Sequence, residues 1–258
     1  MLTAKEIYDL PQSFRAERIT REITGYSRLD DKRNMERSLA LCSVINQFIE
    51  DYFQLQVNGD KRLKDGSVLN RSNLEAAMDN EIEAFYPIAA AEIDKPKIDA
   101  SNPVNLYQMA GASKLSLANT VTRNLSTTLG LLWERIADIS PYAINPELEF
   151  NLKIQGIDLI GLNINKFVVE YIQLKTQHNT LTGSQKPRSV SELSIHENPV
   201  FCAAFYNKSN WTFRDANIPR RSGAEFWETI GISYEIFLDH VFYLVKRLEE
   251  DYVNKLNH

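Results

Sequence analysis

The sequence predicts an α/β protein in which a central mixed β-sheet is flanked by helices, with a helical region at the N-terminus. Two observations support this class. Apolar residues recur at helical spacing in the first half of the chain and again near its end, whereas 147–176 is rich in Ile, Val, Leu, Phe and Tyr. The order is therefore helices, a cluster of strands, and helices again, which is typical of a sheet covered by helices.

The 258-residue chain is long enough for one large domain, or for a core with a helical appendage. We expect a helical N-terminal region over 1–100 and a core with C-terminal helices over 101–258. One continuous domain is the alternative.

The first hundred residues are predicted to be mainly helical, because apolar residues from Leu41 to Phe53 recur at helical spacing and the later stretches continue this pattern. Glycines and prolines mark the breaks between helices. The expected elements are a helix over 35–55, a loop over 56–67, a helix over 71–93 that is broken near Pro87, and a linker over 94–105.

An apolar stripe from Leu117 to Ile136 predicts a long helix over 113–139. Three strands are then expected over 148–154, 157–162 and 167–175, and a short turn over 163–166 joins the last two as a hairpin. The later elements are a polar loop over 177–187, a short helix opening at Ser189, a strand over 200–206, a short strand over 211–213 and a helix over 233–256.

The bulk properties favour a protein outside the membrane. No stretch approaches the roughly 20 apolar residues of a membrane span, and the N-terminus has no signal-peptide run, so a cytoplasmic protein is expected. Cys42 and Cys202 are expected to be buried thiols. The formal charge of −5 counts against nucleic-acid binding, although cations cluster locally. The N-terminal group comprises Arg15, Arg18, Arg21, Arg28, Lys32, Arg33 and Arg37, and the later group comprises Lys186, Arg188, Arg214, Arg220 and Arg221. Either group can form a basic surface, and for the N-terminal group solvated helix faces with paired acids are the alternative.

The predicted hairpin brings a group of reactive side chains together. Alternate residues of a strand share a face, so Gln173 and Lys175 point the same way, and Asp158 lies beside them on the neighbouring strand. Glu134, on the preceding helix, can reach the same cluster. An acid paired with a lysine only as a structural contact is the alternative.

This set of groups suits metal-assisted hydrolysis of a phosphodiester. Mg²⁺ prefers oxygen ligands, which Asp158, the Gln173 amide, the backbone carbonyl of Leu174 and Glu134 can supply. Bound Mg²⁺ polarises a phosphate and acidifies a water molecule. Lys175 can orient that water or stabilise the charge that develops on the phosphate.

The pattern resembles the PD-(D/E)xK nuclease superfamily and, within it, type II restriction endonucleases. The resemblance covers roughly 115–190. Asp158 lies in an apolar strand, Gln173-Leu174-Lys175 follows in a second one, and Glu134 lies in the helical stretch before them. Two positions depart from the pattern, because Ile157 stands in place of proline and Gln173 in place of Glu or Asp. A neutral amide binds a cation more weakly than a carboxylate does.

The resemblance implies a restriction-endonuclease-like fold with a nuclease core over 101–258, and an Mg²⁺-dependent enzyme that cuts double-stranded DNA at a specific sequence and leaves 5′-phosphate ends. It also implies a homodimer and a DNA methyltransferase that protects the host DNA without being a physical partner. The catalytic residues would be Asp158, Gln173, Lys175 and Glu134, and the metal ligands Asp158, Gln173, Leu174 and Glu134. Two other functions remain open: a structure-specific repair or recombination nuclease, and a catalytically weak DNA-binding module of the same fold.

The polar segment behind Lys175 carries amides, hydroxyls and cations, which are the groups that contact phosphates and base edges. An ordinary surface loop is the alternative. The expected DNA-binding residues are Thr176, His178, Asn179, Thr180, Thr182, Ser184, Gln185, Lys186 and Arg188.

Overall fold

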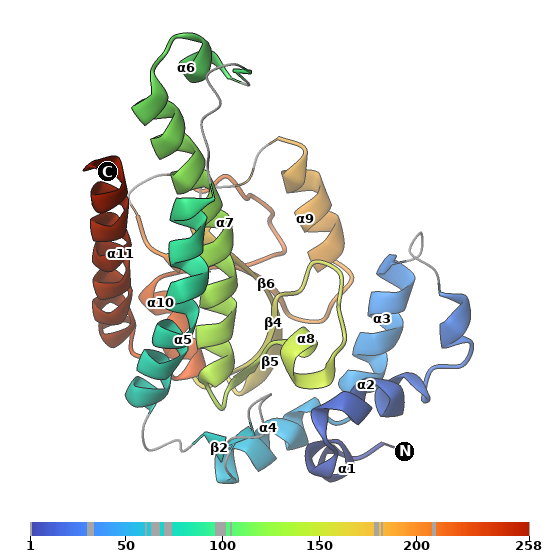
Figure 1. The fold of residues 1–258 in the computed structure, drawn as a ribbon. Coiled ribbons are helices and arrows are strands. Elements are labelled where there is room, and N and C mark those ends of the chain that lie inside the picture. The colour runs from blue at the N-terminus through green and yellow to red at the C-terminus, as the bar shows by residue number, and fades with distance from the viewer. Residues whose placement is uncertain are drawn as a thin grey trace. The chain divides into compact units, whose positions relative to one another are not determined.

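The structure is a computed structural model, and Figure 1 shows its helices and strands. It describes residues 2–29, 34–59, 61–62, 68–69, 74–95, 102–103, 105–177, 181, 183–207 and 210–257. The chain divides into two compact units, of which unit 1 comprises Met1–Leu74 and Glu134–Tyr234, and unit 2 comprises Glu75–Trp133 and Glu235–His258. The predicted boundary near residue 100 falls among residues 96–101, which lie outside the described residues.

Unit 1 is built on a five-stranded sheet in the order β3-β4-β5-β6-β7. Its strands are β3 (Ala143–Ile144), β4 (Leu159–Asn163), β5 (Val168–Gln177), β6 (Pro199–Phe205) and β7 (Arg220–Ser222). The pairs β3–β4 and β4–β5 are antiparallel, whereas β5–β6 and β6–β7 are parallel. The sheet is therefore mixed, and the predicted class, an α/β protein with a mixed sheet flanked by helices, is confirmed.

The predicted hairpin is present as β4 and β5. In its register Leu159 faces Ile172 and Asn163 faces Val168. The side-chain oxygen of Asn163 accepts hydrogen bonds from the backbone N–H groups of Asn165 and Lys166, at 3.0 and 3.2 Å, which closes the turn. The second strand of the hairpin, β5, connects through a helix to its parallel neighbour β6, because parallel strands need such a crossover.

The N-terminal helices of unit 1 pack on one face of this sheet (Figure 1). These elements are α1 (Ala4–Asp9), α2 (Gln12–Thr20), the 3₁₀ turn η1 (Tyr26–Arg28), α3 (Asn34–Ile45) and α4 (Ile49–Asn58). Leu41, Phe48 and Phe53 from the helices share one buried cluster with Ile160 and Tyr171 from the strands. Burial of this apolar surface is the main force that holds the helices to the sheet.

The single helix predicted over 35–55 is wrong, because the structure has two helices, α3 and α4. The N–H groups of Gln47 and Phe48 bond to carbonyls three residues earlier, at 3.1 and 3.0 Å, and end the first helix in a tight turn. This turn places Asn46 where its side-chain oxygen accepts a hydrogen bond from the hydroxyl of Tyr171. Since three residues make almost one helical turn, the apolar stripe stays on the buried side and the periodicity hides the break. The second helix also extends to Asn58, into the predicted loop.

The break predicted near Pro87 is also wrong. Helix α5 (Leu74–Asp94) runs through this proline without interruption. Pro87 is exposed, so the carbonyl that loses its helical N–H partner faces water instead of the core. The loop predicted over 56–67 also contains a short strand, because β1 (Lys61–Arg62) pairs antiparallel with β2 (Val68–Leu69).

The strand predicted over 148–154 is replaced by the short helix α8 (Pro146–Phe150). Its apolar composition resembles that of a strand, but the residues before it form a helix start. The side-chain oxygen of Asn145 accepts hydrogen bonds from the N–H groups of Glu147 and Leu148, at 2.9 and 3.2 Å, and Pro146 occupies the first turn. The capping hydrogen bonds and the fixed φ of proline therefore determine the local structure, although the side chains that follow favour a strand.

Two predictions after β5 need correction. Helix α9 (Gln185–Leu193) begins four residues before Ser189, since Pro187 is tolerated in a first helical turn. The segment predicted as a strand over 211–213 belongs to no strand. Its aromatic residues pack as side chains on Phe201 of β6, and the sheet is completed by β7 instead. The remaining elements of unit 1 are α10 (Ala224–Trp227) and the 3₁₀ turn η4 (Glu228–Ile230).

Unit 2 is helical. It contains α5, α6 (Leu106–Met109), the part of α7 (Ser113–Ile139) that precedes Glu134, and α11 (Tyr234–Asn257), so the long helices predicted over 113–139 and 233–256 are present. Trp133 and Phe237 pack edge to face in its core, with ring centres 5.8 Å apart. Of the helices in the described residues, none combines the length and apolar character needed to cross a membrane.

Candidate active site

Asp158 lies at the point where β4 begins, and its backbone departs from the regular ladder. Its N–H donates to the carbonyl of Ile172 at 2.9 Å, although Ile172 already faces Leu159 in the β4–β5 register. Two residues of one strand thus face one residue of the other, as in a β-bulge. A bulge turns a side chain out of the regular alternation, and here the carboxylate of Asp158 accepts a hydrogen bond from the N–H of Leu174 at 2.7 Å.

Gln173 lies between the two residues of β5 that bind Asp158. Only 5% of Gln173 is exposed, yet its side-chain oxygen has no hydrogen-bond partner among the described residues. A buried acceptor without a partner is destabilising by about 1–3 kcal/mol. This oxygen is therefore an unused ligand at the position where the sequence predicts a metal ligand.

The backbone carbonyl of Leu174 points to the side of β5 on which Asp158 lies. In a β-strand the N–H and C=O of one residue point in the same direction, and the N–H of Leu174 points at the Asp158 carboxylate. The regular pairing of β4 ends at Leu159, so Leu174 lies beyond the last ladder pair. The predicted backbone ligand is consequently next to the predicted carboxylate ligand.

Lys175 completes the predicted group on β5. Its ammonium nitrogen is 3.6 Å from the Asp158 carboxylate, and the two side chains are 32% and 23% exposed. This separation is long for a hydrogen-bonded ion pair, which leaves donor capacity on the ammonium. The side of the group that carries Lys175 is open to solvent, so a substrate can reach it.

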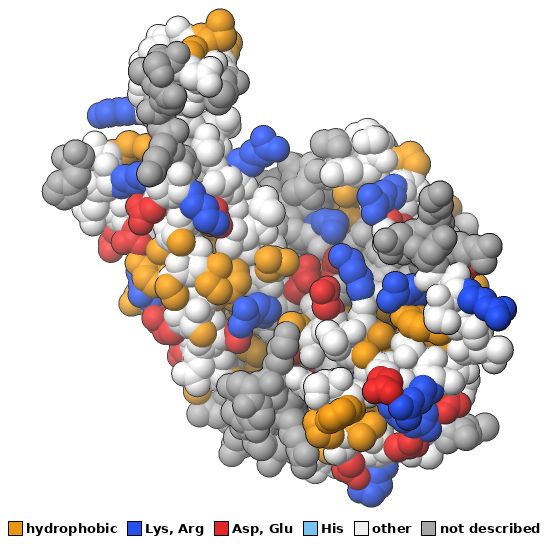
Figure 2. Space-filling model, turned by 45° about the vertical axis from the view of Figure 1, so that its right-hand side comes forward, with side chains coloured by type: hydrophobic (Ala, Val, Ile, Leu, Met, Phe, Trp, Pro, Cys, Tyr) orange, Lys and Arg blue, Asp and Glu red, His pale blue; other side chains and the backbone are white. Residues whose placement is uncertain are grey.

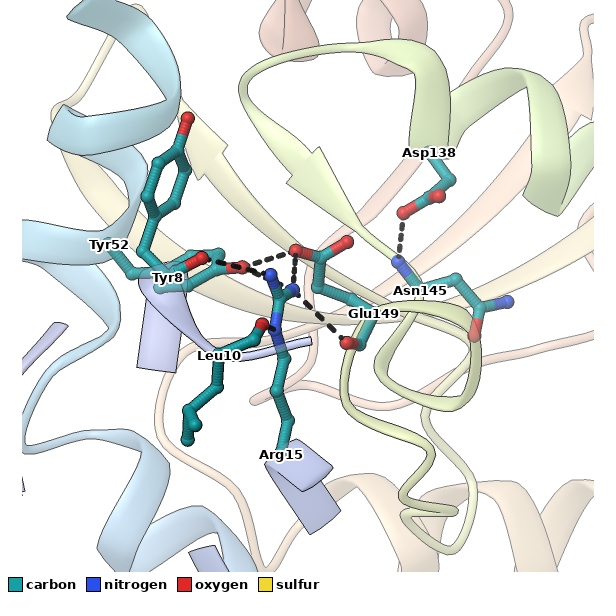
Figure 3. A network of polar contacts seen from close by, with 7 residues as sticks. All are labelled: Tyr8, Leu10, Arg15, Tyr52, Asp138, Asn145 and Glu149. Carbon is teal, nitrogen blue, oxygen red and sulfur yellow. Dashed lines mark hydrogen bonds and ion pairs between the residues drawn. The ribbon is translucent and has the colours of Figure 1, made fainter. Parts of the chain in front are cut away.

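Glu134 approaches the same group from the C-terminal part of α7, which belongs to unit 1. Asn145 donates a side-chain N–H to its carboxylate at 3.3 Å, and the backbone N–H of Asn145 is held by Asp138 at 2.7 Å, as Figure 3 shows. Burial, and then the negative charge of Asp158, raise the pKa of Glu134 to about 8, while Lys175 opposes the shift. The structure therefore brings Glu134, Asp158 and Lys175 within electrostatic reach of one another.

Asp158 has a raised pKa as well. Burial is the main cause, and it outweighs the opposing effects of Lys175 and of the hydrogen bond from Leu174. Two carboxyl groups of one site thus have raised pKa values, and a bound cation would shift both pKa values in the opposite direction.

Glu192 is a residue of this region that the sequence did not single out as a site residue. It lies on α9, only 7% exposed, and its charge contributes to the raised pKa of Asp158. It packs against the turn before Asp158, where Gly156 has a positive φ of 74° and an added Cβ would come within 2.5 Å of the Glu192 side chain. Burial was the missing signal, because the position of Glu192 in the sequence does not show that its side chain is buried beside the turn before Asp158.

The candidate ligands are oxygen donors, which are the donors that a hard cation prefers. They are two carboxylates, one amide oxygen and one backbone carbonyl, which is the donor set that Mg²⁺ prefers over thiolate or imidazole. No group of three or more His, Cys, Asp or Glu side chains suited to a metal ion occurs among the described residues. The amide of Gln173 and the carbonyl of Leu174 are thus necessary members of the proposed set.

The predicted DNA-binding segment is only partly described, since His178, Asn179, Thr180 and Thr182 lie outside the described residues. Thr176 is half-buried within β5, and the exposed Ser184, Gln185, Lys186 and Arg188 form the start of α9 rather than a loop. The guanidinium of Arg188 is paired with Glu192 at 2.6 Å. The exposed residues therefore lie along one helix start that follows the strand of Lys175.

The N-terminal cations are largely paired with acids. Arg15 is buried against Glu149, Arg18 binds Glu6 and Glu22, and Arg21 binds Glu17. Lys32 and Arg33 lie outside the described residues. Figure 2 shows basic and acidic side chains interspersed over the face that it displays. For Arg15, Arg18 and Arg21, the structure favours helix faces with paired acids over a basic surface.

The two cysteines, Cys42 and Cys202, are buried thiols as predicted. No known protein-family model matches the chain, and no protein with a curated function matches its sequence.

Proposed function

We propose that this protein is an Mg²⁺-dependent endonuclease of double-stranded DNA, of the type II restriction kind. The observation that carries the proposal is the buried side-chain oxygen of Gln173, which has no hydrogen-bond partner among the described residues and belongs to the residue between the two β5 residues whose backbone groups bind Asp158. A structural ion pair between Asp158 and Lys175 does not account for this unpartnered acceptor or for the raised pKa values of Asp158 and Glu134, whereas a cation site accounts for both.

In this proposal Asp158, Gln173, the carbonyl of Leu174 and Glu134 hold Mg²⁺, which supplies charge to polarise the phosphate and to acidify a water molecule. Lys175 keeps ammonium donors for the attacked phosphate or the attacking water, because its contact with Asp158 is 3.6 Å long. The N–H of Leu174 orients the Asp158 carboxylate through a hydrogen bond to Oδ2, the same oxygen that lies 3.6 Å from the ammonium of Lys175.

A homodimer follows from the same proposal, because each chain carries one such centre and both strands of a duplex must be cut. A two-fold dimer places one centre on each strand and suits a palindromic site. The proposal also includes 5′-phosphate ends, a restriction-endonuclease-like fold, a cytoplasmic location and a DNA methyltransferase that acts on the same sequence to protect the host.

A DNA-binding module without catalysis is the second candidate, and the neutral amide at Gln173 favours it, since an amide holds a cation more weakly than a carboxylate. A structure-specific nuclease is a third reading of the same centre.

The experiment is a digest of several unmethylated plasmids with about 10 mM Mg²⁺ or Mn²⁺, followed by sequencing of the ends. Discrete fragments with 5′-phosphates support a restriction enzyme, and nicks confined to junctions or flaps support a structure-specific nuclease. The Asp158→Ala variant should not cut, whereas Asp9→Ala, which alters an exposed acid paired with Lys5, should cut normally. Absence of cutting by the wild-type protein with either ion would contradict the restriction function and favour the binding module.

A further inference from the structure

A second polar site lies in unit 1, in the segment between β6 and β7. A cavity of about 560 Å³ is lined by Asn210, Trp211, Arg214, Asp215, Ala216 and Arg220, and we call it the Trp211 recess. Its lining combines two guanidinium groups with an indole ring, an amide and one carboxylate. Such a combination is uncommon for an ordinary surface depression on an acidic protein, because exposed cations tend to pair with the abundant acids.

Arg220 is held in a fixed position and has no carboxylate partner among the described residues. Its guanidinium donates to the carbonyl of Phe213 at 3.0 Å and lies over the Trp211 ring, 5.4 Å from the ring centre. A carbonyl and an aromatic face orient a guanidinium but do not neutralise it. The remaining N–H groups of Arg220 can therefore bind an anion with little loss of side-chain freedom.

Trp211 is itself anchored to the sheet. Its ring packs edge to face on Phe201 of β6 at 6.1 Å, and Phe213 stacks on the same Phe201 at 4.2 Å. Phe201 and Phe213 are fully buried, so the platform beneath Arg220 is part of the core. A binding group that the core holds in place is pre-organised and loses less entropy when a ligand binds.

The charge of the recess differs from that of its surroundings. Arg15, Arg18, Arg188 and Arg221 each contact a carboxylate within 2.7 Å. Neither Arg214 nor Arg220 has an ion pair with a described residue.

The carboxylate of Asp215 accepts the backbone N–H of Asn217 at 2.8 Å, which closes a local turn. Two cations thus face a single acid within the recess, and the balance favours an anionic ligand.

Strand pairing and a hydrogen bond also link the neighbourhood of the recess to that of the candidate active site. β6 runs parallel to β5, and Ala203 of β6 lies directly beside Lys175. The N–H of Leu181, which follows the catalytic strand, donates to the side-chain oxygen of Thr212 in the recess segment at 3.3 Å. Leu181 and the recess segment therefore lie against each other, and one extended ligand that reaches Lys175 can also contact the recess.

We propose that the Trp211 recess binds a backbone phosphate of the DNA strand held at the candidate active site, with Arg214 and Arg220 as its ligands. The inference rests on the proposed function. A phosphate fits better than a stacked base, because the guanidinium of Arg220 already covers the Trp211 ring, and a planar fork of N–H donors matches phosphate oxygens.

The test measures binding of a fluorescent DNA duplex by anisotropy, in EDTA and at several NaCl concentrations. The variants are Arg214→Gln, Arg220→Gln and the double variant. Arg21→Gln is the matched control, because it removes an equal charge from an exposed helix where Glu17 already pairs with it. Each recess variant should weaken binding by on the order of tenfold and lower the salt slope by about one, whereas the control should bind as the wild type does.

Arg214→Gln keeps the test decisive if loss of Arg220 unsettles the segment, because Arg214 makes no hydrogen bond or ion pair with a described residue. Unchanged affinity and unchanged salt slope in the double variant would overturn the inference, and wild-type cutting in Mg²⁺ would show that the proposed function survives. A wild-type protein that neither binds nor cuts DNA would overturn both. If inorganic phosphate binds in the recess of a protein that does not bind DNA, the anion site is real but DNA is not its ligand, which also overturns the inference.

Discussion

Two groups of charged side chains in unit 1 differ in how completely their charges and polar atoms are paired. In the first, shown in Figure 3, the guanidinium of Arg15 contacts the Glu149 carboxylate at 2.6 Å, the Tyr52 hydroxyl at 2.8 Å and the carbonyls of Tyr8 and Leu10 at 3.1 and 2.9 Å. The Tyr52 hydroxyl donates in turn to Glu149. Each of these three side chains has its charge or polar group matched.

In the second group, the candidate active site, matching is incomplete. Lys175 faces Asp158 at 3.6 Å, Glu134 adds a second carboxyl group, and the Gln173 oxygen has no described partner. Burial alone therefore does not distinguish a structural group of charges from a functional one in this fold. The first, fully paired group (the matched group) joins the N-terminal helices to α8. The second, incompletely paired group (the unmatched group) leaves polar atoms without partners among the described residues at an energetic cost, which is typical of functional sites.

The largest expected effect tests the matched group. Glu149→Ala leaves the guanidinium of Arg15 buried without its anion, so we expect unfolding to become easier by about 3–5 kcal/mol. Urea unfolding at pH 7 measures the change. Replacing both partners, with Arg15→Met and Glu149→Leu, should recover part of the loss. If the double variant loses as much stability as Glu149→Ala does, the unpaired charge of Arg15 is not the cause of the loss.

The next effect tests the unmatched group. In the proposed mechanism Lys175→Gln removes the ammonium that would stabilise the attacked phosphate, so the cutting rate should fall by about 10²–10³-fold while DNA affinity changes far less. Single-turnover cleavage and anisotropy separate the two quantities. Lys5→Gln is the control, because Lys5 also pairs with an aspartate but on the exposed surface. A Lys175→Gln enzyme with a wild-type rate would exclude a catalytic role for this lysine.

A third change sharpens the role of Gln173. Gln173→Glu adds a charge beside Asp158 and Glu134, so the metal-free protein should unfold at a lower temperature and bind Mn²⁺ on the order of tenfold more tightly. Calorimetric titration measures the affinity. Gln54→Glu makes the same exchange at an exposed position of α4 and should change neither property. If Gln173→Glu binds Mn²⁺ no better than the wild type, the Gln173 oxygen is not a ligand.

The smallest effect concerns pH. The pKa of Glu134 is about 8 in the folded protein, above the ordinary value of 4.5, so the folded state retains a proton that the unfolded chain releases between these values. Stability therefore falls as pH rises through this window. Glu134→Gln removes this loss and should stabilise the protein by on the order of 1 kcal/mol at pH 8.5 and by much less at pH 5.

Thermal unfolding of wild type and Glu134→Gln at pH 5 and pH 8.5 measures this difference, with Glu17→Gln, an exposed acid, as the control. The same stabilisation at both pH values would mean that the Glu134 carboxyl is not the titrating group.

The sequence predicted the hairpin of β4 and β5 well, because the alternation of β5 and the turn at Asn163 are local features. It did not predict α8, since Asn145 and Pro146 override the strand-like composition of the residues that follow them. It missed β7, because Arg220–Ser222 has no apolar pattern and joins the sheet only through its neighbour β6. Local propensity was insufficient where long-range pairing decides the structure.

The candidate site was predictable in its residue types but not in its electrostatics. Alternation along β5 places Gln173 and Lys175 on one face, but it does not show that Asp158 enters through a bulge or that the Gln173 oxygen lacks a partner. Glu192 and the Trp211 recess depend on burial and on contacts between segments distant in sequence, which spacing does not encode.

The most direct test of the central claim, that the unmatched group is a cation site for cutting DNA, compares wild type and Asp158→Ala on supercoiled plasmid with Mg²⁺ and with EDTA. The account predicts cutting only by the wild type and only with Mg²⁺. Cutting by wild type in EDTA, or by Asp158→Ala in Mg²⁺, would contradict it.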